Sequence, residues 1–442
     1  MERYSSYKNS NVSWIGMIPE HWETYIFKRL IKYRKAGSWG SEPKTSEIDC
    51  TCLRIADFDY DKFRFQRKTD NTIRSYKWKE LEDRILKQGD ILIEKSGGGE
   101  KTPVGRAILY DLNINNAMYA NFMEKIAPKE SLVSKFLVYI LSLMYSRRAI
   151  WTYVKYTTGI QNLDLTSMLS NEKIPVPPLA EQEKIVSYLE SKTSKIDAYV
   201  ADKEKEIQLL QELKQKTIAE AVTKGLNPDV KMKDSGISWI GMIPEHWEMK
   251  QLRSFLSLFT EKGHGDAQLL SVTREQGVIL RDKDNKEENH NFVPEDLSGY
   301  KYIEKGDFAI NKMKAWQGSY AVSDYNGIVS PAYFTCKLKG VNKDFFSRAI
   351  RSKAYIPFFT QYSKGIRVDQ WDLNPNALKS IPFLLPPVDE QRAIVSYIEE
   401  KCQKIDTLTT ELQAEIDYLK EYKQRLIADV VTGQVNVQNI NI

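Results

Sequence analysis

An unusual eleven-residue sequence occurs twice in this chain. Ser-Trp-Ile-Gly-Met-Ile-Pro-Glu-His-Trp-Glu stands at residues 13–23 and again at 238–248, an offset of 225 positions. A second repeat, Pro-Pro-x-x-Glu-Gln-x-x-Ile-Val-Ser-Tyr, lies around Gln182 and Gln391, an offset of only 209 positions. The repeated segments therefore enclose two stretches that differ in sequence and in length. This pattern predicts two like frames that carry two dissimilar domains.

Length and composition limit the class of protein. A chain of 442 residues is too long for one ordinary core, and 42% hydrophobic with 28% charged residues is typical of globular proteins. No apolar run approaches the roughly 20 residues of a membrane span, and the N-terminus lacks a signal sequence, so we expect a cytoplasmic protein. The net charge of +5 is too small to establish a polyanionic partner. Four scattered cysteines predict buried free thiols: Cys50, Cys52, Cys336 and Cys402.

Each half of the chain ends in a segment suited to one long helix. Residues 181–224 and 389–432 contain neither proline nor glycine, and apolar residues recur along them at spacings of three, four and seven. Gly225 and Gly433 stand where a glycine commonly ends a helix. A helix of about 40 residues is roughly 60 Å long, more than a compact core requires. We expect the two helices to form an antiparallel coiled coil; the alternative is that each lies on its own domain.

The expected fold class is α+β, with two mixed α/β domains separated by the two long helices and related by an internal pseudo-twofold repeat. Strands are predicted at 91–93, 107–110, 271–273 and 278–280, and shorter helices at 134–145 and 343–352. The predicted boundaries are 1–173 for the first domain with its frame, 174–232 for the first long helix, 233–380 for the second domain with its frame, and 381–442 for the second long helix and C-terminal tail.

Two pairs of loops are candidates for binding a phosphate backbone and bases. One loop in each half follows a Gly-Asp strand; its candidate residues are Lys95, Ser96, Gly97, Gly98 and Lys101 in the first half, and Lys312, Lys314 and Gln317 in the second. The other precedes the proline-rich segment, with Thr158, Gly159, Gln161 and Asn162 in the first half and Lys364, Gly365 and Arg367 in the second. Backbone amides and ammonium groups bind phosphates, whereas Gln, Asn, Arg and Lys read base edges. An ordinary solvated loop is the alternative at each place.

The candidate catalytic motifs in the sequence are incomplete. Lys101-Thr102 follows glycines, but the spacing of a nucleotide-binding loop fails. Asn227-Pro228 and Asn374-Pro375 lack the second proline and the aromatic residue of an adenine methyltransferase motif. No nuclease-like cluster of carboxylates and lysine, metal cluster or nucleophile is evident. His21 and His246 belong to the repeated frames, where a structural role is expected.

The repeated motifs resemble those of the specificity subunits of type I restriction-modification enzymes. Trp-Ile-Gly-x-Ile-Pro-Glu-His-Trp opens each half, and the proline-rich Glu-Gln motif opens each long helix, so the resemblance extends from Lys8 to Gly433. One departure is that the second proline motif, read from Ile381, is two residues longer than the first, read from Ile174. We expect this difference to tilt the second domain slightly.

The resemblance implies a non-catalytic DNA reader. Each variable domain would be a target recognition domain that binds one half of a split, asymmetric DNA sequence, and the helices would set the spacing between the halves. Two modification subunits, which carry S-adenosylmethionine, and restriction subunits, which use ATP and Mg²⁺, would be the partners, and this chain itself would hold no cofactor. The frames would dock the modification subunits through eight residues: Trp14, Ile15, Pro19, Trp22, Trp239, Ile240, Pro244 and Trp247.

Two other functions are weighed against this reader. A stand-alone duplicated methyltransferase or nuclease would turn over DNA without partners, given Mg²⁺ and S-adenosylmethionine. A scaffold with no role in DNA binding would keep its target unchanged when residues 24–173 are exchanged. The reader hypothesis predicts instead that this exchange changes the target, and that a heptad inserted after Glu204 changes only the spacing.

Overall fold

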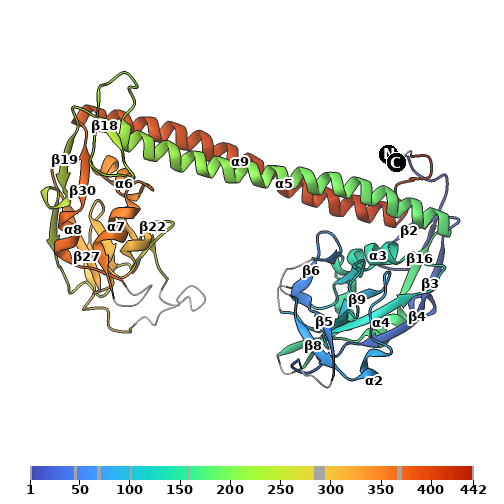
Figure 1. Ribbon diagram of the computed structural model, residues 1–442. Helices are drawn as coiled ribbons and strands as arrows, with labels where there is room; N and C mark the ends of the chain where they lie inside the picture. The colour runs from blue at the N-terminus through green and yellow to red at the C-terminus, as the bar shows by residue number, and fades with distance from the viewer. Residues whose placement is uncertain are drawn as a thin grey trace. The chain divides into compact units, whose positions relative to one another are not determined.

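The computed structural model describes residues 2–43, 47–66, 71–99, 102–157, 159–282, 294–365 and 371–440. The chain divides into two compact units. The first unit combines Met1–Asp202 with Glu415–Ile442, and the second is Lys203–Ala414. Each unit therefore contains one α/β domain and a part of both long helices (Figure 1).

The long helices are α5, Leu179–Lys224, and α9, Val388–Val431, which confirms both predicted helices. Each begins directly after a Pro-Pro pair, where the missing amide hydrogens cost no helical hydrogen bond. Each is followed by a glycine with positive φ, +73° at Gly225 and +72° at Gly433, a conformation that other residues adopt at a cost. None of the described helices has the length and apolar character that crossing a membrane requires.

Within each unit the two helices lie side by side and run in opposite directions (Figure 1). In the first unit, Leu189 of α5 shares a core with Leu426 of α9, and the ammonium of Lys423 donates to Asp197 at 2.6 Å. In the second unit, Lys214 of α5 donates to Asp406 of α9 at 2.6 Å. Apolar side chains form the contact, and ion pairs border it.

The first unit is a mixed α/β domain. Among its described residues the main sheet has six strands, in the order β4 (Ile31–Ala36), β13 (Met123–Pro128), β9 (Ile91–Glu94), β11 (Ala107–Leu109), β7 (Arg64–Phe65) and β6 (Phe58–Asp59). Smaller sheets are β12 (Met118–Tyr119), β5 (Ile48–Leu53) and β8 (Ile73–Tyr76), and β10 (Ser96–Gly97), β15 (Ile160–Leu163) and β14 (Val154–Thr157). The helices are α1 (Phe27–Leu30), α2 (Trp78–Leu81), α3 (Ser134–Ser146) and α4 (Leu165–Asn171). The strands predicted at 91–93 and 107–110 and the helix at 134–145 are thus confirmed.

The second unit has a smaller sheet. Its strands lie in the order β20 (Leu256–Phe259), β27 (Tyr333–Leu338), β24 (Phe308–Asn311) and β25 (Tyr320–Val322). Paired beside it are β21 (Leu270–Thr273) with β22 (Gly277–Leu280), β23 (Lys301–Ile303) with β26 (Gly327–Val329), and β28 (Ser363–Lys364) with β29 (Asp372–Leu373). The helices are α6 (Lys343–Arg351), α7 (Ile356–Tyr362) and α8 (Pro375–Ser380). The strands predicted at 271–273 and 278–280 and the helix at 343–352 are confirmed.

Each frame motif contributes to two short antiparallel ribbons. The first ribbons are β1 (Tyr7–Asn9) with β2 (Met17–Pro19), and β17 (Met232–Asp234) with β18 (Met242–Pro244). The others pair β3 (Glu23–Ile26) with β16 (Lys173–Val176), and β19 (Glu248–Gln251) with β30 (Pro382–Leu385).

The second proline motif is not longer than the first, so that part of the sequence analysis is wrong. Glu23 pairs with Val176, and its repeat Glu248 pairs with Leu385, each two residues before the helix-leading second proline. Ile174 therefore corresponds to Phe383 and not to Ile381, because strand pairing rather than residue identity defines the equivalent positions. The expected tilt of the second domain loses its basis.

Candidate nucleic-acid interface

In the first unit the structure brings the two candidate loops together. Strand β10 pairs with β15, so that Ser96 lies opposite Asn162 and Gly97 opposite Gln161. The Ser96 hydroxyl donates to the Asn162 amide oxygen at 2.6 Å. Nothing lies within 4 Å of a side chain built at Gly97, so its backbone faces open space. Two loops that are about 60 residues apart in sequence thus form one surface.

Gln161 supports this surface from inside and does not face solvent. Its side chain is only 4% exposed, its amide nitrogen donates to the Gly99 carbonyl at 3.0 Å, and its amide oxygen accepts from the Val104 amide at 3.1 Å. A side chain at Gly98 would meet the Gln161 oxygen at 2.9 Å, and Gly98 has φ of +68°. In this arrangement Gln161 cannot read a base directly, because its hydrogen-bonding groups are occupied. Its role here is to shape the glycine loop.

The hairpin β14–β15 projects beside the glycine loop and adds residues that the sequence analysis missed. Tyr156 is 74% exposed, and the neighbouring Lys155 and Ile160 are also exposed. Lys155 donates to Asp164 at 2.6 Å, and this hydrogen bond is the largest cause that lowers the pKa of Asp164 to about 2. Gly159 has φ of +82° at the turn. An exposed aromatic ring next to a lysine is suited to a base and a phosphate, respectively.

Buried carboxylates hold the cationic side chains behind the glycine loop. Glu124 forms ion pairs with Lys95 at 3.1 Å and with Arg34 at 3.5 Å. Glu94 accepts hydrogen bonds from Nε and Nη2 of Arg106, at 3.0 and 2.8 Å. These pairs restrict the positions of the cations before any ligand arrives, and Lys95 remains partly exposed.

The second unit also joins its two candidate loops. The Lys312 ammonium donates to Asp372 of β29 at 3.0 Å, and the Leu373 amide donates to the Lys312 carbonyl at 3.1 Å. Strand pairing places Lys364 opposite Asp372. The rings of Trp316 and Trp371 lie 5.1 Å apart and connect the same two segments.

Cationic side chains gather on this second surface. Burial lowers the pKa of Lys301, and the neighbouring ammonium groups of Lys262 and Lys312 lower it further. Met313 and Lys314 are exposed at the loop tip. Gln317 is half-buried in the short 3₁₀ helix Ala315–Gln317, and Gly365 is exposed beside Lys364. Three predicted residues, Lys101, Thr158 and Arg367, lie outside the described residues.

The frame motif of the first unit ties the start of α5 to the end of α9. Glu181, near the start of α5, accepts hydrogen bonds from the Trp22 indole at 3.0 Å and from Tyr4, and pairs with His21 at 2.8 Å. Burial alone would raise the pKa of Glu181, but these hydrogen bonds lower it. A side chain at Gly433, after α9, would collide with Pro19 and press on Trp22.

The frame motif of the second unit makes the equivalent tryptophan and histidine contacts. Glu390, near the start of α9, accepts from the Trp247 indole at 2.8 Å and pairs with His246 at 2.6 Å. A side chain at Gly225, after α5, would lie 3.2 Å from Trp247. Each frame motif therefore holds the start of one long helix and the end of the other, which agrees with the structural role expected for both histidines.

The glutamine of the repeated Glu-Gln pair joins each helix to its α/β domain. Buried Gln182 donates to the Pro177 carbonyl at 2.9 Å and accepts from the Val133 amide, just before α3, at 2.8 Å. Gln391 donates to the Pro386 carbonyl at 2.8 Å and accepts from the Asn342 amide, just before α6, at 2.9 Å. The glutamine is repeated in both halves because in each it joins the start of a long helix to the segment before a domain helix.

The predicted partner-docking residues are mostly interior residues of their own units. The buried ones are Trp14, Ile15, Pro19, Trp22, Ile240, Pro244 and Trp247, whereas Trp239 is 42% exposed. Burial leaves little of these seven side chains exposed for direct contact with a partner. Met17 and Met242, at equivalent places in the two frame motifs, are about half exposed instead.

Comparison with known proteins agrees with this architecture. Residues 19–209 match the family "Type I restriction modification DNA specificity domain". The EcoKI specificity subunit of Escherichia coli is 25% identical over 81% of this chain and 77% of its own length. The MjaVIII specificity subunit of Methanocaldococcus jannaschii is 27% identical over 68% and 71%, and a second protein of that organism, assigned to the MjaX enzyme, is 23% identical over 96% of each chain.

Two solved structures share the fold. A chain from a study of complex assembly and conformational transition of the type I R-M system aligns with a TM-score of 0.65, over 95% of this chain and 99% of that one. The HsdS subunit from Thermoanaerobacter tengcongensis aligns with a TM-score of 0.52, over 95% and 98%. Both are 14% identical in sequence. Together with the sequence matches, they show that this chain shares the fold of these proteins and is similar in sequence to type I restriction enzyme specificity subunits.

Proposed function

We propose that each unit reads one half of a bipartite, asymmetric DNA sequence and that the chain has no catalytic activity of its own. One observation carries the proposal: each unit joins its two candidate loops into one surface, and the two surfaces differ in sequence. The first presents a glycine loop beside Tyr156, and the second presents Lys312 and Lys314 beside Trp371. Two dissimilar surfaces on like frames suit two different half-sites.

We propose further that α5 and α9 form an antiparallel coiled coil that sets the spacing of the half-sites. The two ion pairs between the helices support one continuous register, because Asp197 and Lys214 are 17 residues apart on α5, and Asp406 and Lys423 are 17 residues apart on α9. Half-sites read from one face of a duplex lie about 34–36 Å apart, one helical turn. A pair of helices roughly 60 Å long is compatible with that distance.

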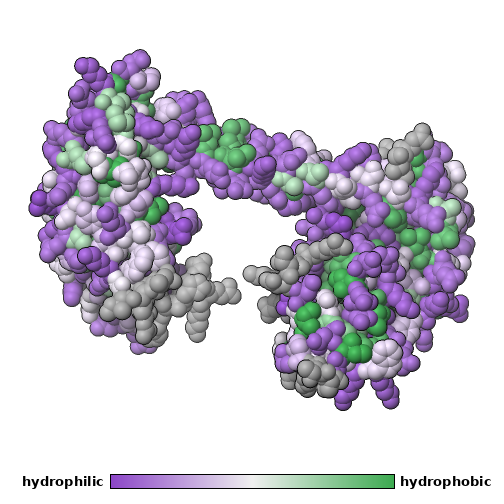
Figure 2. All heavy atoms as spheres, in the orientation of Figure 1, coloured by the Kyte–Doolittle hydropathy of each residue, from purple (hydrophilic) through white to green (hydrophobic). Residues whose placement is uncertain are grey.

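The frames and helices are the proposed docking surfaces for two modification subunits, to which restriction subunits then bind. Figure 2 shows that the surface of the paired helices is mainly hydrophilic with a small hydrophobic patch. In the second unit, Leu209, Leu213 and Leu408 of the helices are about half exposed, and apolar residues on an outer helical face favour a partner. S-adenosylmethionine, ATP and Mg²⁺ would be held by the partners.

The proposal is tested with the purified complex of this chain and its modification subunit. Binding to a cognate duplex, identified by methylome sequencing of the host, should exceed binding to a random duplex by at least 10³-fold at physiological salt. Exchange of residues 24–173 for those of a relative should change one half-site and leave the other unchanged. Equal binding to both duplexes, or turnover of DNA by the chain alone, would contradict the reader role.

A further inference from the structure

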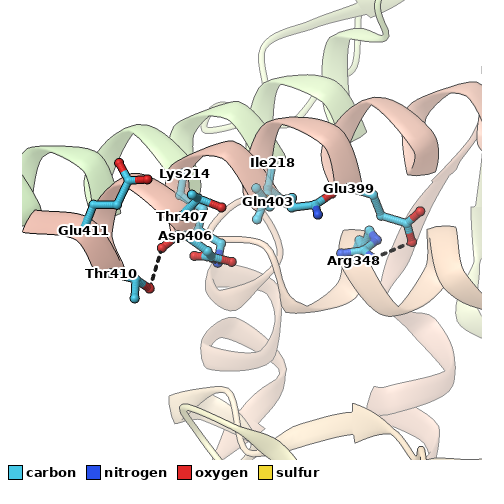
Figure 3. Close-up of a pocket in the computed structure, with 10 residues that line it drawn as sticks. Lys214, Ile218, Arg348, Glu399, Gln403, Asp406, Thr407, Thr410 and Glu411 are labelled. Carbon is cyan, nitrogen blue, oxygen red and sulfur yellow. Dashed lines mark hydrogen bonds and ion pairs between the residues drawn. The ribbon is translucent and has the colours of Figure 1, made fainter. Parts of the chain in front are cut away.

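The second unit contains an open groove where α6 meets the paired helices (Figure 3). Its volume is about 800 Å³. Lys214 and Ile218 of α5, Arg348 of α6, and Cys402, Asp406 and Thr407 of α9 contribute to its walls. All of its lining residues belong to the second unit, and none of them is a residue of the candidate nucleic-acid interface.

The first unit fills the equivalent place with one of its own loops. By the offset of 209 positions, Lys423 corresponds to Lys214 and Asp197 to Asp406. The Lys423 ammonium donates to Asp197 at 2.6 Å and also to the Asp61 carbonyl at 2.6 Å. The loop that carries Asp61 thus covers the ion pair.

Two further contacts hold this loop in the first unit. Counting from Val133 and Asn342, which the repeated glutamines bind, Tyr139 takes the place of Arg348. The ring of Phe63 packs edge-on against Tyr139 at 5.4 Å, and the Lys135 ammonium donates to the Lys62 carbonyl at 3.2 Å. In the first unit the place equivalent to the groove is therefore filled by the Asp61 carbonyl, which faces Lys423, and by the Phe63 ring, which faces α3.

Among the described residues of the second unit, no loop covers the Lys214–Asp406 ion pair in this way. The groove also contains a buried hydrogen-bond donor that has no acceptor. Lys214 is 29% and Asp406 is 60% exposed, against 9% and 25% for Lys423 and Asp197. The Arg348 guanidinium donates to Glu399 at 2.8 Å through Nη2, but its Nε is buried without an acceptor. A buried donor without a partner is unfavourable, and an incoming acceptor would remove this cost.

We infer that this groove receives a loop of the modification subunit docked on the second unit. A backbone carbonyl oxygen of that loop faces Lys214, as the Asp61 carbonyl faces Lys423 in the first unit. A second acceptor faces Arg348, and an apolar side chain packs on Ile218 and Cys402. A DNA phosphate is disfavoured because three carboxylates, Glu399, Asp406 and Glu411, also line the groove. The identity of the partner rests on the proposed function; the chemistry of the occupant rests on the groove.

The position of the groove supports the same partner. Glu399 is nine residues from Glu390 along α9, about 14 Å at 1.5 Å per residue, and Glu390 is bound by the frame motif. A subunit docked on that frame reaches the groove without crossing the α/β domain. Because the first unit fills its own groove, two identical modification subunits are held differently.

Site-specific cross-linking tests the occupant. The photoreactive residue p-benzoylphenylalanine is placed at Thr407, an exposed residue in the groove wall, or at Lys401, an exposed control on another face of α9. In the complex of full-length chain and modification subunit, position 407 should cross-link to one loop of the modification subunit at least tenfold more than position 401. No cross-link at 407, equal cross-links at both positions, or a cross-link to DNA or the restriction subunit overturns the inference.

A groove-filling substitution gives an independent reading. Thr407→Trp should weaken binding of the second modification subunit at least tenfold while the first binds normally, so native mass spectrometry should show one-copy complexes; Lys401→Trp should keep two copies. Two copies with Thr407→Trp overturn the inference. If the unmodified complex methylates its target but position 407 cross-links to nothing, only this inference fails; if it does not recognise DNA, the proposed function fails.

Discussion

The indole nitrogen of Trp22 lies 3.0 Å from a carboxylate oxygen of Glu181, and it donates a hydrogen bond to it. Trp247 and Glu390 repeat this relationship at 2.8 Å. The tryptophan comes from the repeated frame motif and the glutamate from the first turn of a long helix. The repeated sequence therefore contains an internal joint that each half of the chain requires.

Removing the charge of Glu181 should destabilise the first unit. The hydrogen bonds from Tyr4, His21 and Trp22 lower the pKa of Glu181 in the folded protein. The ionised carboxylate therefore contributes its full stabilisation above about pH 4.3, the ordinary glutamate pKa. This stabilisation is lost as the pH falls through the lowered pKa of the folded state. Glu181→Gln should reduce the free energy of unfolding by about 2 kcal/mol at pH 7. Thermal unfolding from pH 3 to 8 should show the difference narrowing in acid. A constant difference, or an equal loss in the exposed control Glu20→Gln, would contradict this.

Gln161 should affect DNA binding through the shape of the glycine loop. Gln161→Leu removes the hydrogen bonds to Gly99 and Val104 and should weaken binding to the first half-site about tenfold. Gln161→Glu keeps the acceptor for Val104 but turns a carboxylate oxygen toward the Gly99 carbonyl, so it should weaken binding at least as much. Competition binding with duplexes mutated in one half-site measures this. Normal loop order in hydrogen exchange together with normal affinity would count against the role.

Lys312 and Lys314 should act on the phosphate backbone. Each Lys→Gln substitution should weaken binding to all duplexes to a similar degree, and each should reduce the slope of log affinity against log salt by about 1. Lys339→Gln, an exposed control in the same unit, should leave the slope unchanged. Altered preference for particular bases with an unchanged slope would assign these lysines to base reading instead.

The C-terminal tail should stabilise the first unit. Val437 is fully buried in its core, and the Asn436 amide donates to the Glu2 carbonyl at 2.9 Å, so the two ends of the chain lie together (Figure 1). Val437→Ala should lower the free energy of unfolding by about 2 kcal/mol, whereas the exposed Val388→Ala should change it by less than about 0.5. Chemical denaturation measures both. Equal effects would mean that the tail is not part of the core.

The helices were predictable because their signals are local. The segments without proline or glycine and the terminal Gly225 and Gly433 defined α5 and α9 to within two residues. The strands at 91–93 and 278–280 were likewise visible as short apolar runs. The sequence pattern was therefore sufficient to predict those helices and strands whose conformation depends mainly on neighbouring residues.

The role of individual side chains was not predictable because it depends on distant contacts. Gln161 has the residue type of a base reader, yet a loop about 60 residues away buries it. Trp22 has the type of an interface residue, yet it packs on Gly433 at the far end of the chain. Lys155 and Tyr156 belong to no recognisable sequence motif. They become candidates only because the structure exposes them on the hairpin beside the glycine loop. Strand register, too, was needed to align Ile174 with Phe383.

The central claim is that two different DNA-reading units are held at a fixed spacing by the paired helices. The most direct test inserts seven residues after Glu204 and seven after Glu415, which preserves the register defined by the Asp197–Lys423 and Lys214–Asp406 pairs. Methylome sequencing should then show the same two half-sites separated by up to about 3 additional base pairs, since seven helical residues add about 10.5 Å. Unchanged spacing with full methylation would contradict the account.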